Sequence, residues 1–166
     1  MSASWNILRV EPGEAFEILQ KLQSQDGYNV LVDLTAVDYS TEPALLEKPA
    51  RFDVVYRVAR IDAETGLEKP PRVELHAAVG EEPLLRSVVS LWPVADWLER
   101  EVWDMFGVRF VDRPDIKRLL LYESFLGHPL RKDYPIDRRQ PLIGPPSGEP
   151  EGNPSFNSLE PTIRYE

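Results

Sequence analysis

The sequence of 166 residues contains no cysteine. The sequence therefore excludes every site that needs cysteine: thiolate-held iron–sulfur clusters, thiolate zinc sites, disulfides and cysteine nucleophiles. Histidine is scarce as well. His76 and His128 have no second histidine at ligand spacing, so we interpret each as structural rather than as a metal ligand.

Long apolar runs and an excess of positive charge are also missing. No apolar stretch approaches the roughly 20 residues that span a bilayer, and the first residues lack the basic and apolar regions of a secretory signal. Lys and Arg total 19 against 28 Asp and Glu, a formal charge of -9, so the phosphate neutralisation that dominates nucleic-acid binding has no global source. We expect a cytoplasmic chain that binds no nucleic acid and meets a membrane only through partners.

Several motifs for catalysis and cofactor binding are absent from the sequence. No serine lies in a Gly-x-Ser-x-Gly turn, so hydrolase chemistry has no specific support. No Gly-x-Gly-x-x-Gly follows a strand, and no Gly-rich loop ends in Lys-Ser or Lys-Thr, so the backbone cradles for dinucleotides and nucleoside triphosphates are missing. We therefore expect the chain itself not to bind NADH.

The first half of the sequence alternates between helical and extended patterns. Apolar residues after Pro12 recur at helical spacing until Gln25-Asp26-Gly27, which predicts an amphipathic helix with Pro12 in its first turn. Alternating runs then predict three strands: 29–37, with Val30, Val32, Leu34 and Ala36 on one face, 52–58 and 73–79. The turn residues 62–66 are too short for a crossover helix, so the second and third strands should pair antiparallel.

The second half begins with three predicted helices. Residues 83–91 favour a short helix with Leu84, Leu85, Val88 and Val89 on one side. Residues 94–106 favour a longer helix with an apolar stripe of Val94, Leu98, Val102 and Met105, ended by Gly107 in the left-handed conformation. Pro114 and Asp115 fit the first turn of another short helix through Leu121. The predicted fold class is α+β, a small sheet with antiparallel pairing covered by helices, plus an extended Pro-rich C-terminal arm.

Two residues of the longer helix break its amphipathic pattern. Glu101 falls inside the apolar stripe, and a carboxylate facing a core costs several kcal/mol unless it is paired, so we expect a buried partner such as Arg57 or Arg118. A structural ion pair is the favoured interpretation, and a proton-transfer carboxylate is the alternative. Trp103 should point outward, where it would serve a protein interface or be covered by the chain's own tail.

The run from Gly127 to Pro135, which we call the basic strip, contains three basic groups, His128, Arg131 and Lys132, and two prolines, Pro129 and Pro135. An extended, stiff strip of this kind suits docking to a partner, although a solvated loop is the simpler interpretation. From Pro135 onward, proline and glycine recur so often that no helix or central strand can persist. We therefore expect a core domain over 1–134 and an extended tail over 135–166.

The helix at 94–106 contains a long and specific signature, Glu99-Arg100-Glu101-Val102-Trp103-Asp104-Met105-Phe106-Gly107-Val108 followed by Phe110. It resembles the signature of the NuoC family of NADH-quinone oxidoreductase (complex I) subunits. Similar family segments match Leu31–Tyr39, Pro114–Leu120 and the basic strip, so the resemblance covers most of residues 29–135. The chain departs from the family at Asp112-Arg113, where Gly-His is usual, which puts any role of that histidine in doubt.

The resemblance implies a structural subunit of the peripheral arm that binds no cofactor itself, within a complex that uses FMN, iron–sulfur clusters, NADH and quinone. It implies docking on a NuoD-like subunit, and beside a NuoB-like subunit, at the cytoplasmic side of the bacterial inner membrane. The tail would run extended over the neighbour and order on assembly. The family signature residues are Glu99, Arg100, Glu101, Trp103, Asp104, Phe106 and Gly107, and the expected docking residues are His128, Pro129, Arg131, Lys132 and Asp133.

Two other functions fit parts of the sequence. An accessory subunit of a membrane-bound, energy-converting hydrogenase could use the same module, and only neighbouring genes or co-purified subunits would separate it from complex I. A free-standing acidic enzyme could use carboxylates with His128 as acid–base groups. A purified monomer that turns over a small substrate would favour this last alternative.

Overall fold

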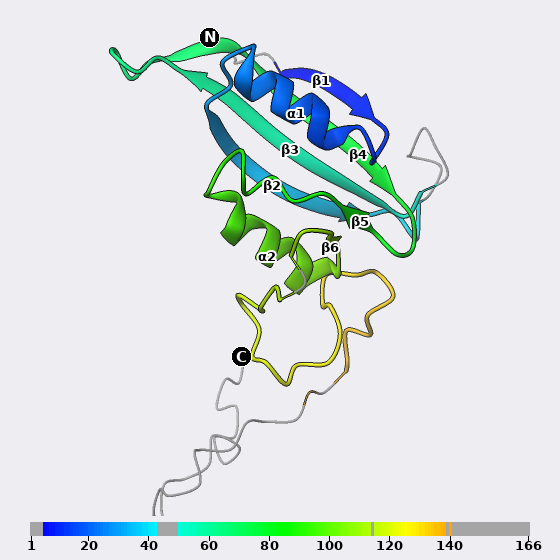
Figure 1. Cartoon of the computed structure of the whole chain (residues 1–166). Helices are drawn as coiled ribbons and strands as arrows, with labels where there is room; N and C mark the ends of the chain where they lie inside the picture. Colours follow the sequence, from blue (N-terminus) through cyan, green and yellow to red (C-terminus); the bar gives the residue numbers. More distant parts are fainter. Residues whose placement is uncertain (1–4, 43–49, 114, 139, 141–166) are drawn as a thin grey trace, which may run out of the picture.

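The computed structural model describes residues 5–42, 50–113, 115–138 and 140, which form an α+β fold (Figure 1). The elements in chain order are β1 (Trp5–Val10), α1 (Ala15–Ser24), β2 (Val30–Asp38), β3 (Phe52–Ile61), β4 (Glu68–Val79), β5 (Leu84–Leu85), α2 (Ala95–Phe106) and β6 (Arg109–Phe110). The larger sheet has the order β1-β4-β3-β2, and β5 pairs with β6. The predicted fold class is confirmed, whereas most of the predicted Pro-rich arm lies outside the described residues.

The hairpin of β3 and β4 forms the centre of the larger sheet. The two strands pair antiparallel, with Tyr56 opposite Leu75. At the turn, the Asp62 carboxylate accepts hydrogen bonds from the N–H groups of Glu64 and Thr65 at 3.0 Å each, and Gly66 takes a φ of +68°. Both the turn and the antiparallel pairing predicted from the sequence are confirmed, because local side-chain chemistry determines them.

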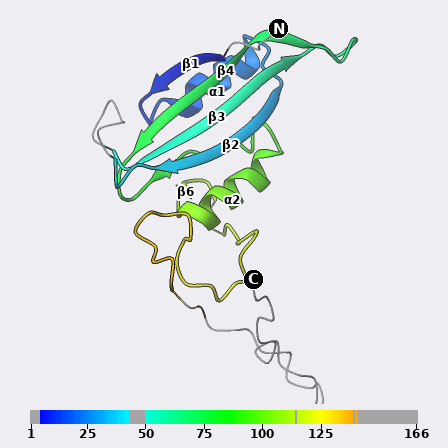
Figure 2. The ribbon, with the colours of Figure 1, turned by 180° about the vertical axis from the view of Figure 1, so that it is seen from behind.

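Helix α1 covers one face of the sheet (Figure 1), and its apolar side is buried there. Phe16, Leu19 and Leu22 join one cluster with inward residues of β2, β3 and β4. Burying each such side chain stabilises the fold by about 1.5–3 kcal/mol. Seen from behind, the opposite face of the sheet has no described helix over it (Figure 2). The helix begins at Ala15, so Pro12 lies in the preceding turn rather than inside the helix.

Strand β1 was not predicted from the sequence. It pairs parallel with β4, with Leu8 opposite Leu75. Leu8 and Val10 pack against the core, whereas Arg9 between them is exposed and Ile7, before Leu8, is 50% exposed. Alternation is therefore present, but only over a short strand at the edge of the sheet, where few contacts reinforce the pattern.

Strand β2 contains an irregularity that changes which side chains face the core. Its pairing with β3 shifts between Leu31 and Asp33. Leu31 is buried, whereas Val32 is 49% exposed. The prediction that Val32 shares the inner face with Leu34 and Ala36 is wrong, because an extra residue in one strand reverses the alternation at that point.

The segment 83–91, predicted as a short helix, contains β5 and turns instead. The N–H of Arg109 donates to the carbonyl of Pro83 at 2.9 Å, and the N–H of Val111 donates to the carbonyl of Leu85 at 2.8 Å. The backbone of this segment is thus paired with β6 across more than twenty residues of sequence. The spacing of its apolar residues fitted a helix, but its backbone forms hydrogen bonds with β6 instead of within a helix.

Helix α2 lies beside β2 (Figure 1) and ends as predicted. Gly107 takes φ +78° and ψ +18°, and its N–H donates to the carbonyl of Trp103 at 2.8 Å. The predicted stripe is only partly right, because Val94 is exposed and Ala95 is buried in its place. Among the described residues, no helix is both long and apolar enough to cross a membrane.

Candidate functional site

Helix α2 carries two carboxylates, Glu99 and Asp104, that have no exposed surface. Glu101 is exposed, so the prediction that Glu101 faces the core is wrong. Neither expected partner serves it, because Arg57 pairs with Glu74 at 2.7 Å and Arg118 pairs with Asp104 at 2.6 Å. The idea of a buried carboxylate with an arginine partner was right in kind, but it applies to the glutamate two residues earlier in the chain.

Glu99 accepts hydrogen bonds from three groups of the chain. The Val88 N–H donates at 2.7 Å, the Ser87 hydroxyl at 2.9 Å and the Arg113 guanidinium at 3.1 Å. Burial raises the pKa of Glu99 above its ordinary value, against the opposing effect of these donors. Ser87 and Val88 are the residues that were expected in a helix, and their attachment to Glu99 explains why this segment takes an irregular path.

Arg113 stands where the resemblance noted in the sequence leads us to expect a histidine, and the structure shows what the arginine does in this chain. Its guanidinium contacts the Glu99 carboxylate, the Asp96 carboxylate and the Asp96 carbonyl. The buried Glu99 carboxylate of α2 is therefore paired with a residue at which the sequence departs from the signature that it resembles. Sequence reasoning noted the departure but did not connect it with Glu99.

Asp104 binds the loop that follows β6. One carboxylate oxygen accepts the backbone N–H groups of three successive residues, Leu119, Leu120 and Leu121, at 2.9–3.0 Å, and the other accepts Arg118. Burial would raise the pKa of Asp104, but these hydrogen bonds lower it below its ordinary value. The short helix predicted after Pro114 is absent from the described residues, because these three N–H groups bind Asp104 instead of carbonyls one turn back.

Two arginines hold the same loop against α2. Arg100 donates from its guanidinium to the carbonyls of Lys117 and Arg118 at 3.1 and 2.8 Å. Arg118 donates to the carbonyls of Phe125 and Gly127 at 2.8 and 3.2 Å. The signature residues Arg100 and Asp104 therefore replace the backbone partners that a regular element would provide.

Gly107, Trp103 and His128 meet at the end of α2. A side chain at Gly107 would approach the His128 ring to 2.8 Å, and the rings of His128 and Trp103 make a T-shaped contact with 6.1 Å between centroids. His128 Nδ1 donates to the carbonyl of Asp104 at 3.0 Å. Burial, with the nearby charges of Arg118 and Arg131, lowers the pKa of His128. Trp103 is thus partly covered by the chain itself, and Phe106 beside it packs against the core.

The basic strip is a series of turns rather than the predicted extended segment. The N–H of Arg131 donates to the carbonyl of His128, and the N–H of Tyr134 donates to the carbonyl of Arg131. Pro129 lies in the first of these turns, and the next N–H, that of Leu130, bonds the carbonyl of Met105 at 3.1 Å. The prolines did not keep this stretch extended, because its N–H groups find partners within its own turns, at Met105 of α2 and at Asp38 of β2.

A buried ion pair of the larger sheet fixes the middle of the basic strip. The Asp38 carboxylate accepts the Lys132 N–H at 2.9 Å and the Arg51 guanidinium at 3.0 Å. Arg51 also contacts Asp133 at 2.9 Å, and Arg131 contacts Asp133 at 3.3 Å. Burial alone would raise the pKa of Asp38, but these donors and the Ser40 N–H outweigh it and lower the pKa to about 2. Neither Asp38 nor Arg51 was singled out in the sequence.

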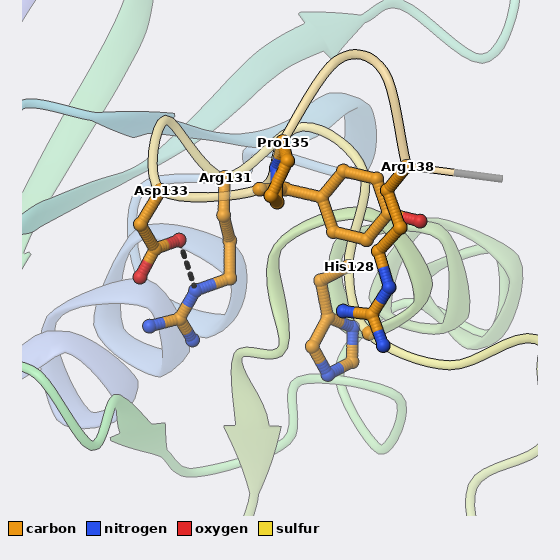
Figure 3. A pocket seen from close by; sticks show the side chains of 7 residues that line it. His128, Arg131, Asp133, Pro135 and Arg138 are labelled. Atoms are coloured by element: carbon orange, nitrogen blue, oxygen red, sulfur yellow. Dashed lines mark hydrogen bonds and ion pairs between the residues drawn. The ribbon is translucent and has the colours of Figure 1, made fainter.

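The basic strip also lines an open pocket of about 260 Å³ between Gly127 and Arg138. Figure 3 shows Arg138 extending toward His128 on one side and the pair of Arg131 and Asp133 on the other. The Arg138 guanidinium lies over the Tyr134 ring, 5.6 Å from its centroid. Tyr134 in turn packs on Gly127, where an added Cβ would approach the ring to 2.9 Å.

The remaining histidine, His76, lies on the face of the sheet opposite α1. Its two ring nitrogens contact the carboxylates of Asp53 at 2.7 Å and Glu74 at 2.9 Å. Within the described part of the chain, no group of three or more metal-ligating side chains is arranged to hold an ion. The site is therefore an assembly of paired charges that joins irregular segments to α2 and to the sheet.

Trp97, which the sequence analysis did not single out as an outward aromatic, is more exposed than Trp103. Trp97, four residues after Pro93 on α2, is 57% exposed, and the Arg100 guanidinium lies 5.1 Å from its ring centroid. Trp103 is the more covered of the two. The signal for Trp97 was present in the helical projection, once the inward face is taken to run through Ala95 and Glu99.

Comparisons with known proteins give one consistent result. Residues 8–140 match the model of a family described as respiratory-chain NADH dehydrogenase, 30 Kd subunit. A NADH-quinone oxidoreductase subunit of Ruegeria sp. (strain TM1040) is 40% identical over 140 residues, 80% of this chain and 64% of that protein. The NADH dehydrogenase [ubiquinone] iron-sulfur protein 3 of Beta trigyna is 41% identical over 116 residues, 70% of this chain and 54% of that protein. The chain thus spans between half and two thirds of the length of these relatives.

A solved structure supports the fold. The chain is similar to Nqo5 of a trypsin-resistant fragment (1-134), with 33% sequence identity and a TM-score of 0.55, covering 69% of this chain and 83% of that one.

Proposed function

This chain belongs to the family of the 30 Kd subunit of the respiratory-chain NADH dehydrogenase, and from that membership we propose that it is a structural, non-redox subunit of the peripheral arm of NADH-quinone oxidoreductase (complex I). The observation that carries the proposal is the match over residues 8–140. In this role the chain supports electron transfer from NADH to quinone, coupled to proton translocation, while other subunits hold FMN and the iron–sulfur clusters. The absence of cysteine is consistent with this division, because such clusters are held by thiolates.

The way the chain uses its charged side chains supports a structural role. Glu99, Asp104 and Asp38 are buried, and each accepts several hydrogen bonds from the chain itself. A group that acts as a general acid or base must reach a substrate proton at hydrogen-bond distance, and these carboxylates are enclosed by their own partners. They determine the shape of the molecule, and fixed geometry is what electron transfer between neighbouring subunits requires.

We assign docking on a NuoD-like subunit, with a NuoB-like subunit beside it, to the basic strip and to the tail 135–166. In the strip, the backbone is fixed by Asp38 and Met105, while the side chains of Leu130 and Lys132 remain exposed. A fixed backbone with outward side chains loses little conformational freedom on binding. Docking of this kind would place the chain at the cytoplasmic side of the inner membrane, attached through its partners.

Affinity purification from the native host tests the proposal. A tagged copy of the chain, extracted from membranes with mild detergent, should carry NuoD-like and NuoB-like subunits identified by mass spectrometry, and deletion should abolish NADH-quinone oxidoreductase activity in membranes. Recovery of hydrogenase subunits would instead support the energy-converting hydrogenase. A chain that elutes alone would exclude both assemblies.

A charge reversal tests the docking surface within the same experiment. Lys132→Glu changes an exposed side chain whose backbone N–H, and not its ammonium group, bonds Asp38. Lys117→Glu makes the same charge change on another exposed loop and is the matched control. We expect Lys132→Glu to reduce co-purification of the NuoD-like subunit and Lys117→Glu to leave it unchanged. Equal recovery with both variants would remove the strip from the interface.

A further inference from the structure

The pocket beside the basic strip has the properties of a receptor for a negatively charged group. We propose that it binds a carboxylate presented by another protein, an aspartate or glutamate side chain, with the Arg138 guanidinium as the main donor. The inference rests on the proposed function, because it assumes that the strip is covered by a partner in the complex. It adds the chemistry by which that partner is recognised.

The first support is a local reversal of charge. The chain as a whole carries a formal charge of -9. The described residues in and beside the pocket nevertheless include more basic than acidic side chains, with Arg131, Lys132 and Arg138 against Asp133 and Asp137. The acidic residue that lines the pocket, Asp133, contacts Arg51 and Arg131, so its charge is already matched. An acidic group of a partner would therefore meet complementary charge at this pocket, although the chain as a whole is acidic.

The second support is an unused donor. Among the residues that the structure describes, the Arg138 guanidinium makes no hydrogen bond or ion pair, although its backbone N–H donates to the carbonyl of Pro135 at 3.1 Å. Its planar group lies over the Tyr134 ring and extends toward His128 (Figure 3). A guanidinium offers two parallel N–H groups that match the two oxygens of a carboxylate.

The third support is that the walls of the pocket are held in place before any ligand arrives. Tyr134 stacks on Phe125 at 6.0 Å between centroids and accepts a hydrogen bond from the Gln140 side chain. His128 is fixed by its bond to the Asp104 carbonyl. Because these groups are already ordered, binding a carboxylate costs little further entropy on this side of the contact.

A protein, rather than a small free anion, is the source of the carboxylate that we propose. The segment that forms the pocket also exposes large apolar side chains, with Leu130 at 52% and Ile136 fully exposed. Apolar residues next to arginines are typical of the buried centres of protein interfaces, and a small anion would leave these residues in water. A partner that covers Leu130 and Ile136 would bring its own side chains to Arg138.

Substitution of Arg138 in the full-length chain, followed by purification of the assembled complex, tests the proposal. Arg138→Gln removes the charge but keeps a polar side chain, and Arg109→Gln is the matched control because Arg109 is an exposed arginine on β6 with a single long contact. We expect Arg138→Gln to weaken retention in the complex at moderate salt by about tenfold, the effect of one charge-assisted pair, and Arg138→Lys to fall between. Unchanged melting of the isolated variants shows that folding is not the cause.

A photo-crosslinking residue at position 136 identifies what lies over the pocket while leaving Arg138 intact. We expect adducts with a peptide of another subunit that contains aspartate or glutamate. Adducts only with residues 141–166 of the same chain would overturn the proposal in favour of the chain's own tail. If the unmodified chain assembles and Arg138→Gln is retained equally well, this inference fails while the proposed function stands. If the unmodified chain does not assemble at all, both fail.

Discussion

The larger sheet with α1 and the region from α2 to Gln140 are stabilised in different ways. In the first, apolar side chains such as Leu75 and Phe52 meet in one cluster, and regular strand pairing satisfies the backbone. In the second, most residues after β6 are in turns or irregular structure, and side chains satisfy the backbone. Asp104 accepts three successive N–H groups, and Arg100 donates to two carbonyls. Charged side chains here form the backbone hydrogen bonds that helices and strands form in the first region.

The difference shows what an irregular segment needs in order to take one conformation. A backbone N–H or C=O that is removed from water without a partner costs about 1–3 kcal/mol, so a long segment without helix or strand must find partners elsewhere. A charged side chain can accept or donate several bonds from one position. Buried charges at Asp104, Glu99 and Asp38 therefore define the paths of three separate segments.

Removing Asp104 should have the largest effect. Asp104→Ala leaves three backbone N–H groups and the Arg118 guanidinium without their acceptor, and we expect a loss of about 3–5 kcal/mol in the free energy of unfolding. Urea denaturation measures the loss, and hydrogen exchange should show the amides of Leu119–Leu121 exposed first. Asp112→Ala, at an exposed position, is the control. An equal effect of both variants would contradict the role given to Asp104.

A core substitution in the sheet should lower the free energy of unfolding by less than Asp104→Ala, and it should affect amide protection in a different pattern. Leu75 is fully buried in β4, and Leu75→Ala should cost about 3 kcal/mol through lost burial and the cavity left behind. In contrast to Asp104→Ala, we expect protection of the amides of the sheet and of the loop to fall together, since the sheet supports both regions. Selective exposure of Leu119–Leu121 in the Leu75 variant would show that the two regions do not differ as described.

Acid should weaken the contact between the two regions, because it protonates Asp38 of β2, which accepts the Lys132 N–H. Its pKa of about 2 lies below its ordinary value of 3.8, so the folded state binds this proton more weakly than the unfolded chain does. The stability that Asp38 contributes is therefore complete above about pH 4 and is lost as the pH falls through 3.8 toward 2, by about 2 kcal/mol. Urea denaturation of the wild type and Asp38→Asn between about pH 5 and pH 2 should show the steeper fall in the wild type. Parallel curves would contradict the assignment.

The smallest effect is expected at Glu101. Its side chain is exposed, so Glu101→Ala should change the free energy of unfolding by less than about 0.5 kcal/mol, the usual range for surface substitutions. Glu99→Ala on the same helix should cost several times more, because it leaves Arg113 and the Val88 N–H without an acceptor. Thermal melting of the pair compares two glutamates that differ only in the side of α2 on which they lie.

The sequence was sufficient where local residues determine the structure. The β3–β4 hairpin and the end of α2 at Gly107 were predicted because turn chemistry and a left-handed glycine act within a few residues. The segments 83–91 and 115–121 were predicted wrongly as helices. Their backbone partners, β6 and Asp104, lie far away in the sequence, and apolar spacing carries no information about them.

The candidate site was predicted in part, and its main error has a geometric cause. The helix of 94–106 was right, but its inward face was centred on Val94 rather than Ala95. Successive residues of a helix turn by about 100°, so a shift of one position exchanges Glu99 and Glu101 between the core and the solvent. The roles of Asp38 and Arg51 could not be predicted, because nothing near them indicates that residues 130–133 will return to β2.

The bond between the Asp38 carboxylate and the Lys132 N–H joins residues 94 positions apart. A ribosome that adds about 5–20 residues per second therefore releases the two partners on the order of 5–20 s apart. In that interval a nascent sheet can already pair Asp38 with Arg51, but the carboxylate still lacks its last donor. The edge of the sheet at Asp38 therefore stays open until Lys132 has left the ribosome and can donate its N–H.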